Sequence, residues 1–166
     1  MTEKQTKEKI MSIKSFGEIN NVNINKNDSR KKCKISIVTA YYNRKQLFYQ
    51  TLKSIAKTTY NDFEVIAVDD CSLPEERIEE FLSEFPFLKI IRLEPENKWY
   101  INPCIPLNIG IRAAIGEIII LQNPECLHVH DVITYLSENV NDCNYISISA
   151  YAINDEITNK LPILID

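Results

Sequence analysis

Acidic residues stand directly behind two apolar stretches of this sequence. Asp69 and Asp70 follow the run FEVIAV, and Glu125 comes four residues after the run IIIL. A carboxylate at the end of a buried strand is costly unless it meets water, a hydrogen-bond donor or a cation. Because an ionised carboxylate only accepts hydrogen bonds, Asp70 could select a nucleobase with a ring N–H, such as uracil or guanine. Asp69 is equally well explained as a cap for the turn that follows it.

The segment from Glu117 to Asp131 also holds candidate metal ligands. The carboxylate of Glu125 suits Mg²⁺ or Mn²⁺, which would bridge to a diphosphate. His128 and His130 follow within five residues, and imidazole suits Mn²⁺ better than Mg²⁺. The alternative is that each histidine packs at the start of the next helix. We predict a divalent-cation site whose ligands are Glu125 and His128.

Aromatic residues accompany these polar groups. Tyr41 and Tyr42 come directly after the first predicted strand, and Trp99 and Tyr100 lie in a longer loop. An aromatic ring at such a place could pack against a nucleobase. The alternatives are that one of the two tyrosines belongs to the core and that Trp99 only anchors its loop.

The residue pattern predicts a scaffold of alternating strands and helices. We expect strands at 35–40, 63–68, 88–93, 118–121 and 145–151. We expect helices from an Asn43 N-cap to Ala56, from Pro74 to Pro86, from Ile105 to Ala114 with Gly116 as the C′ residue, and from His130 or Asp131 to Leu136. This alternation predicts an α/β fold with a mostly parallel sheet flanked by helices. The unbroken apolar run at 118–121 is typical of a strand buried on both faces.

Bulk composition narrows the class of protein. The chain has 166 residues, 45% hydrophobic, with a net charge of -4, which suits a soluble domain with a real core. The absence of a long basic stripe argues against nucleic-acid binding. No apolar run approaches the roughly 20 residues of a membrane span, and the N-terminus lacks the apolar core of a secretory signal. We therefore expect a cytoplasmic protein.

The chain divides by composition into two parts. Residues 1–32 are rich in Lys, Asn, Glu, Thr and Ser and predict a flexible N-terminal arm, whereas residues 33–166 predict one folded domain. The 5 cysteines have no C-x-x-C spacing, so neither a disulfide framework nor a zinc site is indicated. With 3 glycines, neither G-x-G-x-x-G nor G-x-x-x-x-G-K-[ST] is present.

Two stretches resemble a known family. The string KISIVTAYYNRKQLFYQTLKSIAKTTYNDFEVIAVDDCS, residues 34–72, is similar to the opening of the family-2 glycosyltransferases of the GT-A fold. The string LNIGIRAAIGEIIILQNPE, residues 107–125, resembles the family segment that begins R-N-x-G and ends D-x-D-D. The match covers about residues 34–135, and the spacing between its blocks also fits. The fold that this resemblance implies is the GT-A type of α/β sheet, similar to the Rossmann fold.

The resemblance also implies nucleotide-binding residues. Ala40 falls where the family's backbone borders the base, Tyr42 is the motif tyrosine, and Asp70 matches the aspartate that typically binds uracil. The implied nucleotide-binding set is Thr39, Ala40, Tyr42, Asp70, Asn108, Asn123 and Glu125. The implied cofactor is a divalent cation, Mn²⁺ or Mg²⁺.

This sequence departs from the family pattern at three places. Leu107 stands where R-N-x-G has its arginine. Gln122 and Pro124 take the two aspartate positions of D-x-D, which leaves Glu125 as the remaining acid. The chain ends at Asp166, whereas family members usually continue into an acceptor half that carries the catalytic base. We therefore expect a fragment truncated before that half, with the base outside this chain.

The function that these features predict is a glycosyltransferase domain that binds a nucleotide-diphospho-sugar, with a UDP-sugar favoured, for transfer to an unknown acceptor. Further domains of the same polypeptide are expected partners. One alternative is a non-catalytic nucleotide-binding or docking module derived from a glycosyltransferase. A nucleotidyltransferase is a weaker alternative, because it needs a Gly-rich phosphate loop that this sequence lacks.

Overall fold

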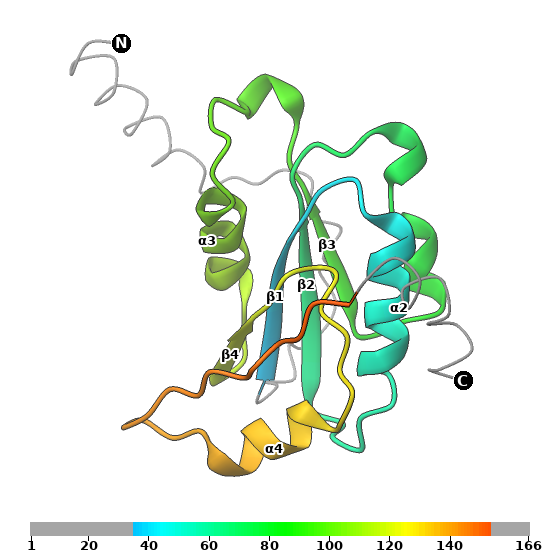
Figure 1. Ribbon diagram of the computed structural model, residues 1–166. Helices are drawn as coiled ribbons and strands as arrows, with labels where there is room; N and C mark the ends of the chain where they lie inside the picture. The colour runs from blue at the N-terminus through cyan, green and yellow to red at the C-terminus, as the bar shows by residue number, and fades with distance from the viewer. Residues whose placement is uncertain (1–34, 154–166) are drawn as a thin grey trace, which may run out of the picture.

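The computed structural model describes residues 35–153, apart from the side chain of Asn97, and Figure 1 shows their arrangement. The predicted N-terminal arm, residues 1–32, lies outside the described residues. Four strands form one parallel sheet in the order β3-β2-β1-β4. Their bounds are β1 Ile35–Tyr41, β2 Phe63–Asp69, β3 Leu88–Arg92 and β4 Ile118–Leu121. The predicted α/β fold with a parallel sheet is therefore confirmed.

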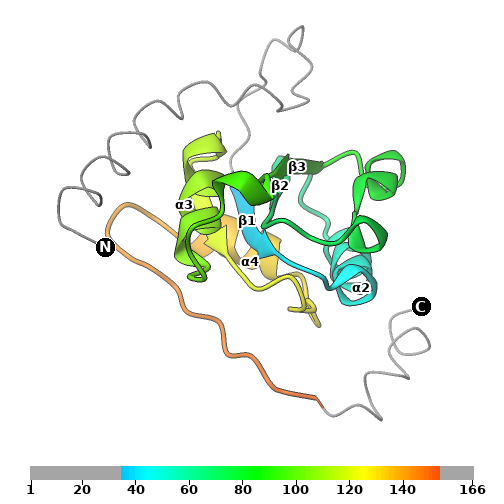
Figure 2. The same ribbon diagram turned by 90° about the horizontal axis from the view of Figure 1, so that it is seen from above.

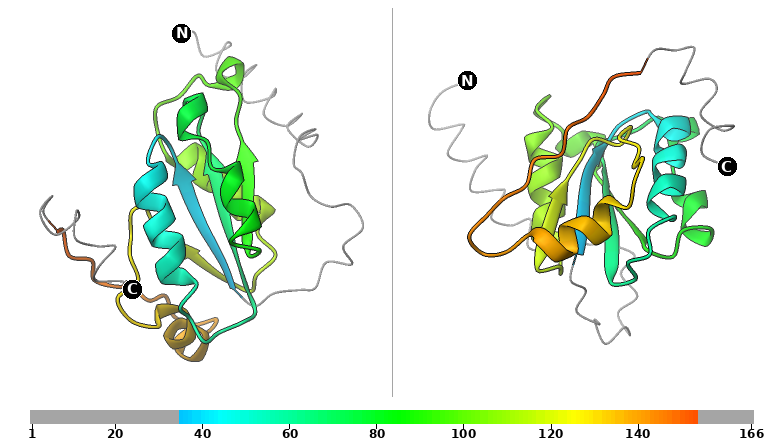
Figure 3. Two further views of the ribbon diagram at one scale, coloured as in Figure 1. Left: turned by 90° about the vertical axis from the view of Figure 1, so that its right-hand side faces the viewer. Right: turned by 60° about the horizontal axis from the view of Figure 1, so that its bottom comes forward.

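Helices cover both faces of this sheet. Among residues 35–153, the α-helices are α2 Lys45–Ile55, α3 Cys104–Ala113 and α4 Val132–Asn139. Seen from above, α2 and α3 lie on opposite sides of the strands (Figure 2). Turned so that its bottom comes forward, the molecule shows α4 crossing the end at which the strands begin (Figure 3). None of the helices in residues 35–153 is long and apolar enough to cross a bilayer.

Strand β1 is the centre of the core. It pairs with β2 on one side and with β4 on the other, and its residues 35–39 are almost fully buried. Because successive side chains of a strand point to opposite faces, Ile37 joins the core cluster that contains Phe48 of α2. Val38 instead packs with Ile66 and other residues on the α3 side.

The expectation that strand 118–121 is buried on both faces is wrong. Ile118 is buried, but Ile119 and Leu121 are 38% and 54% exposed. Ile118 and Ile120 point to the face that carries α2, so Ile119 and Leu121 point to the opposite face. The physical reason for their exposure is that α3, on that face, packs mainly over β1 and β2. An apolar run does not reveal which helices cover a strand, and the strand buried on both faces is β1.

Two local predictions also differ from the structure. Instead of one helix, residues 74–86 form two short 3-10 helices, η2 Pro74–Glu76 and η3 Glu79–Ser83, because Arg77 adopts extended backbone angles between them. Residues 145–151 form no strand. Their side chains alternate as a strand requires, but within the described chain they have no ladder partner, and Tyr145 is 91% exposed. A further 3-10 helix, η4 Pro95–Asn97, precedes α3.

Gly116 has a packing role and not the predicted C′ role. Helix α3 ends at a C-cap Ala114, and Gly116 does not take a left-handed conformation. A Cβ on Gly116 would lie 2.5 Å from the backbone nitrogen of Ser36. The Gly116 N–H donates to Ser36 Oγ at 2.8 Å. Glycine is needed here because the chain entering β4 runs directly against β1.

A buried carboxylate ties these elements together. Glu64 of β2 accepts hydrogen bonds from Ser36 Oγ at 2.6 Å and from the Ile115 N–H at 3.0 Å. Lys89 of β3 pairs with its other oxygen at 2.5 Å. Burial raises the pKa of Glu64, but the bonds from Lys89, Ser36 and Ile115 outweigh burial and lower it overall. Glu64 therefore stays ionised and links β1, β2, β3 and the start of β4.

Asp131 holds α4 against the loop between α2 and β2. Its carboxylate caps the helix by accepting from the Thr134 N–H at 3.1 Å. It also accepts from Thr58 Oγ1 at 2.5 Å and from the Thr59 N–H at 2.9 Å. Burial raises the pKa of Asp131, but these donors lower it well below its ordinary value. The predicted helix start at His130 or Asp131 is confirmed.

Gly110 sets how closely α3 approaches the sheet, and its replacement by alanine tests this. A Cβ at residue 110 would lie 2.4 Å from Val38 Cγ1 and 3.0 Å from Val68 Cγ2. Val38 is fully buried and β-branched, so it cannot move aside easily. We expect Gly110→Ala to lower the free energy of unfolding by about 1–3 kcal/mol, although Gly→Ala normally favours a helix by up to about 1 kcal/mol.

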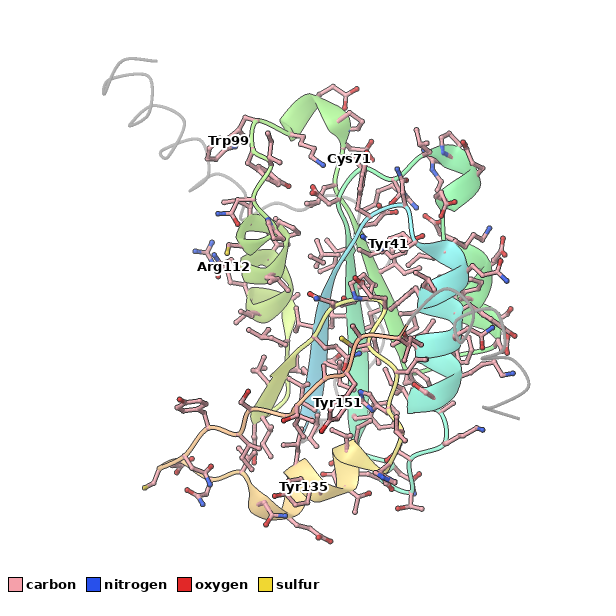
Figure 4. The ribbon with its side chains drawn as sticks, viewed as in Figure 1. Tyr41, Cys71, Trp99, Arg112, Tyr135 and Tyr151 are labelled. Carbon is pink, nitrogen blue, oxygen red and sulfur yellow. The ribbon has the colours of Figure 1, made fainter. Side chains whose placement is uncertain are left out.

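Urea unfolding of the full chain measures this difference. The matched control is Arg112→Ala, an exposed position of the same helix (Figure 4), which should change stability by less than about 0.5 kcal/mol. A Gly110→Ala protein as stable as the original chain would contradict the close packing.

The Asp131 cap predicts a loss of stability in acid. The pKa of Asp131 is lower in the folded chain than its ordinary 3.8. Its contribution is therefore complete above about pH 4 and disappears as the pH falls through the folded pKa. We expect Asp131→Ala to cost about 1–2 kcal/mol at neutral pH.

Urea unfolding near pH 7 and near pH 3 checks this, since the gap between original and variant should shrink in acid. Asp142→Ala, an exposed aspartate beyond α4, is the control and should cost nothing at either pH. A gap that stays constant with pH would rule out the ionised cap.

Candidate functional site

Four loops leave the carboxyl ends of the parallel strands. Those after β1, β2 and β3 lie at the top of Figure 1, whereas the loop after β4 leaves lower, because Leu121 at the end of β4 pairs with Val38 in the middle of β1. The four loops begin at Tyr42 after β1, Asp70 after β2, Leu93 after β3 and Gln122 after β4. Asp70 and Glu125 thus follow the two strands that flank β1. In open α/β sheets, this edge beside the central strands is where ligands bind.

The first two loops are bonded to each other. The Asn43 N–H donates to Ser72 Oγ at 3.1 Å, and the Leu73 N–H donates to Asn43 Oδ1 at 2.9 Å. Asn43 and Cys71 both have positive φ, 48° and 67°, a conformation that asparagine tolerates better than most residues. The prediction of Asn43 as the N-cap of α2 is wrong, because Arg44 takes that position without a side-chain cap bond.

Asp69 is a structural residue in this arrangement. It is fully buried, its Oδ2 pairs with Arg92 Nη1 at 2.6 Å, and its Oδ1 accepts from the Ser72 N–H at 2.8 Å. Arg92 also pairs with Glu79 of η3. Asp69 therefore caps the turn after β2, the alternative that the sequence left open, and ties that turn to β3.

Asp70 presents its carboxylate to a different set of groups. Its Oδ2 pairs with Lys98 Nζ at 3.0 Å, and its Oδ1 accepts from the Tyr100 hydroxyl at 3.0 Å. Its side chain is 11% exposed. Burial, followed by the bond to Asp70, raises the pKa of Tyr100, so the phenol stays protonated and donates. Asp70 is therefore a hydrogen-bond acceptor at the rim of the sheet, by which we mean the edge at the carboxyl ends of the strands. Each of its carboxylate oxygens has one donor.

Aromatic rings lie around this carboxylate. Tyr42 is 49% exposed, and the Lys98 ammonium lies 4.7 Å from the centre of its ring, a cation–π contact. Trp99 packs edge-on against Tyr100 with ring centres 5.7 Å apart. Figure 4 shows Trp99 at the same end of the molecule as Cys71, beyond the carboxyl ends of the strands. Tyr41, in contrast, belongs to the core, as the sequence allowed for one of the two tyrosines.

Other predicted nucleotide-binding residues occupy different positions. Thr39 is buried in β1, and its hydroxyl has no hydrogen-bond partner within the described part of the chain. Ala40 follows it and is partly exposed. Asn108 is exposed on α3.

The loop after β4 holds the predicted metal ligands. Glu125 is exposed and lies 3.9 Å from Arg44 Nη1. His128 Nε2 lies 2.9 Å from Gln122 Oε1, and its backbone N–H donates to Ser54 Oγ of α2 at 3.0 Å. Burial lowers the pKa of His128, which keeps its ring neutral, whereas His130 is exposed.

The donor set limits what cation this loop could hold. Within residues 35–153, no group of three or more His, Cys, Asp or Glu side chains is placed to hold a metal ion. Glu125 supplies one hard oxygen ligand, and the His128 ring is engaged with Gln122. One protein carboxylate fits Mg²⁺ or Mn²⁺ only where phosphate oxygens or water supply most of the remaining ligands.

Lys98 is the residue of this site that sequence reasoning missed. It lies in the loop between β3 and α3, 28 residues from Asp70, and reaches Asp70 only because that loop folds back over the end of β2. Its local sequence resembles that of any exposed lysine, so no motif marks it.

Curated proteins similar to this chain are glycosyltransferases. WcaA of Escherichia coli (strain K12), whose name assigns it to colanic acid biosynthesis, is 32% identical over 85 residues, which is 51% of this chain and 30% of WcaA. The uncharacterized glycosyltransferase RC0461 of Rickettsia conorii is 28% identical over 127 residues, 74% of this chain and 20% of that protein. The chain thus spans less than a third of either relative.

Solved structures agree on the fold. S. aureus TarS 1–349 is 27% identical with a TM-score of 0.53, over 63% of this chain and 32% of TarS. The complex of the same protein with UDP is 26% identical, with a TM-score of 0.50. The mannosyltransferase PcManGT of Pyrobaculum calidifontis, 17% identical with a TM-score of 0.51 over 79% of this chain and 40% of its own, shares the fold.

The family itself is established by a longer match. The sequence model of glycosyl transferase family 2 matches residues 36–164, which is most of the chain and includes the loops that carry Asp70 and Glu125. The GT-A-like sheet described above is the one that this match requires. This chain therefore belongs to glycosyl transferase family 2.

Proposed function

We propose that this chain is the donor-binding part of a glycosyltransferase that uses a nucleotide-diphospho-sugar, with a UDP-sugar favoured. The observation that carries the proposal is the carboxylate of Asp70, held at the carboxyl end of β2 with 11% of its side chain exposed. A carboxylate in this position can accept a hydrogen bond from the ring N–H of uracil. The UDP-bound structure of TarS, 26% identical to this chain, supports the choice of base.

The rest of the proposed site follows the same edge. Thr39, Ala40 and Tyr42 border the base beside Asp70. Asn108, Asn123 and Glu125 serve the sugar and diphosphate side. A catalytic base would activate the hydroxyl of the acceptor, and we assign none of the described residues to that role. We propose the cytoplasm as the location of this chain.

A divalent cation, Mn²⁺ or Mg²⁺, is the proposed cofactor. When bound to the diphosphate, it would neutralise the charge that develops on the leaving group. Glu125 is the proposed protein ligand, and it would exchange its 3.9 Å contact with Arg44 for the cation. His128 could join only by releasing Gln122, so we place it second.

A non-catalytic module is the alternative function. The observation that favours it is the loss of acids in the loop after β4, where Gln122 engages His128 at 2.9 Å and Pro124 is buried. Neither side chain offers a carboxylate to a cation. Such a module would bind a nucleotide without needing metal, or would serve as a docking domain for the rest of its protein.

Metal dependence separates these two functions. With Mn²⁺ present, we expect the full chain to bind UDP about tenfold or more tightly than without it, because Glu125 would help to hold a cation that neutralises the diphosphate. Glu125→Ala should remove this gain. Titration calorimetry with UDP, with and without Mn²⁺, measures both effects.

The matched control is Glu138→Ala, which removes an exposed carboxylate of α4 at the other end of the sheet. It should keep the full gain from Mn²⁺. A UDP affinity that changes neither with Mn²⁺ nor in Glu125→Ala would contradict the metal-dependent enzyme and favour the non-catalytic module.

Asp70 itself provides a second prediction. Asp70→Asn keeps the size of the side chain but removes the charge that accepts the base N–H, so UDP affinity should fall about tenfold or more. Asp142→Asn, an exposed aspartate beyond α4, should leave affinity unchanged. Equal UDP affinity in the original chain and Asp70→Asn, again by calorimetry, would exclude Asp70 as the base contact.

A further inference from the structure

Lys98 and Asp70 form a pair that offers a donor and an acceptor side by side. Lys98 Nζ lies 3.0 Å from Asp70 Oδ2 and 3.0 Å from the Asp70 backbone oxygen. The ammonium carries three N–H donors. Since two of them point to Asp70, a third can be given to another acceptor without breaking either contact.

The pair is both accessible and held in place. The side chains of Lys98 and Asp70 are 26% and 11% exposed, so part of each side chain faces solvent. Tyr100 holds the other carboxylate oxygen at 3.0 Å, and the Tyr42 ring lies 4.7 Å from the ammonium. These contacts fix the order of the groups along the edge of the sheet, with the lysine donor next to the aspartate acceptor.

This order is complementary to one edge of a nucleobase. In uracil and in guanine, a ring N–H stands beside a carbonyl, which together form a lactam edge. The N–H can donate to Asp70 while the carbonyl accepts from Lys98. Cytosine and adenine present the opposite pattern, an amino group beside a bare ring nitrogen, so a donor would face the ammonium and an acceptor would face the carboxylate.

We propose that Lys98 is a specificity-determining residue that, together with Asp70, reads the lactam edge of the donor's base. This inference rests on the proposed function, since it assumes that a nucleotide occupies this site. It adds to that function a residue that rejects cytosine and adenine, whose amino group stands where uracil and guanine have the lactam carbonyl. Lys98 recognises the base carbonyl and takes no part in the transfer itself.

UDP and CDP are the matched probes, because they differ only at this edge of the base. Titration calorimetry would measure both against the full chain, Lys98→Met and Lys98→Arg. We expect the original chain to prefer UDP, and Lys98→Met to lose about tenfold in UDP affinity with little change for CDP. Lys98→Arg should keep most of the preference, because the guanidinium still donates.

Lys57→Met is the control for removing a positive charge, since Lys57 is exposed just after α2. It should leave both affinities unchanged. Thermal unfolding of each variant should match the original chain, which separates a binding effect from a folding defect. If Lys98→Met unfolds, Lys98→Gln takes its place, because a neutral amide donor should retain part of the preference.

The outcomes distinguish this inference from the proposed function. A Lys98→Met chain that keeps the original ratio of UDP to CDP affinity, or binds UDP more tightly, overturns the role of Lys98 alone. Equal affinity of the original chain for UDP and CDP overturns this inference and also the contact between Asp70 and the base, while nucleotide binding stands. An original chain that binds neither nucleotide overturns the proposed function and this inference with it.

Discussion

The buried ion pair between Asp69 and Arg92 is the constraint on which the candidate site depends. Asp69 has no exposure to water, and a carboxylate buried in this way must be paired and hydrogen-bonded to remain charged. One oxygen of this carboxylate pairs with Arg92, and the other accepts a hydrogen bond from the Ser72 N–H. These bonds fix the turn after β2, and the turn in turn fixes where Asp70 points. The two adjacent aspartates therefore have different roles. Asp69 holds the loop in place, and Asp70 is available to a ligand at the carboxyl end of the sheet.

The two ends of the sheet also differ in the roles of their residues. At the end where the strands begin, Glu64 and Gly116 lock the strands together through buried bonds and a close backbone approach. At the end where the strands finish, Asn43 and Cys71 take left-handed conformations that let two loops share hydrogen bonds. Residues held in such sparsely populated conformations persist only where their surroundings determine them. Near Asp70 several hydrogen bonds join the loops, whereas in the described part of the chain the contact of the Glu125 carboxylate is with Arg44 at 3.9 Å.

Much of the architecture could be predicted from the sequence, because burial leaves a periodic signal. Apolar runs such as 63–68 predicted strands at the right places, and the spacing of Phe48 and Leu52 predicted α2. The residue types at the strand ends also pointed to Asp70 and Glu125 at a common edge. Errors arose where a pattern depends on a neighbour that local sequence does not specify. Residues 145–151 alternate as a strand does, yet within the described chain they pair with no other strand. Gly116 was predicted to end helix α3, but it is required because the chain there packs against Ser36.

By itself, then, the sequence determined the parallel α/β layout, the family and the carboxylates that reach the rim, since these follow from periodicity and local residue type. Only the tertiary structure decided which aspartate is buried, which strand is central, and which cation meets Asp70. Lys98 lies 28 residues from Asp70 along the chain, and no local pattern encodes a contact over that distance. The reason is physical: hydrogen bonds and ion pairs between loops form only after the sheet has brought its strand ends together, so their partners are chosen by the fold as a whole.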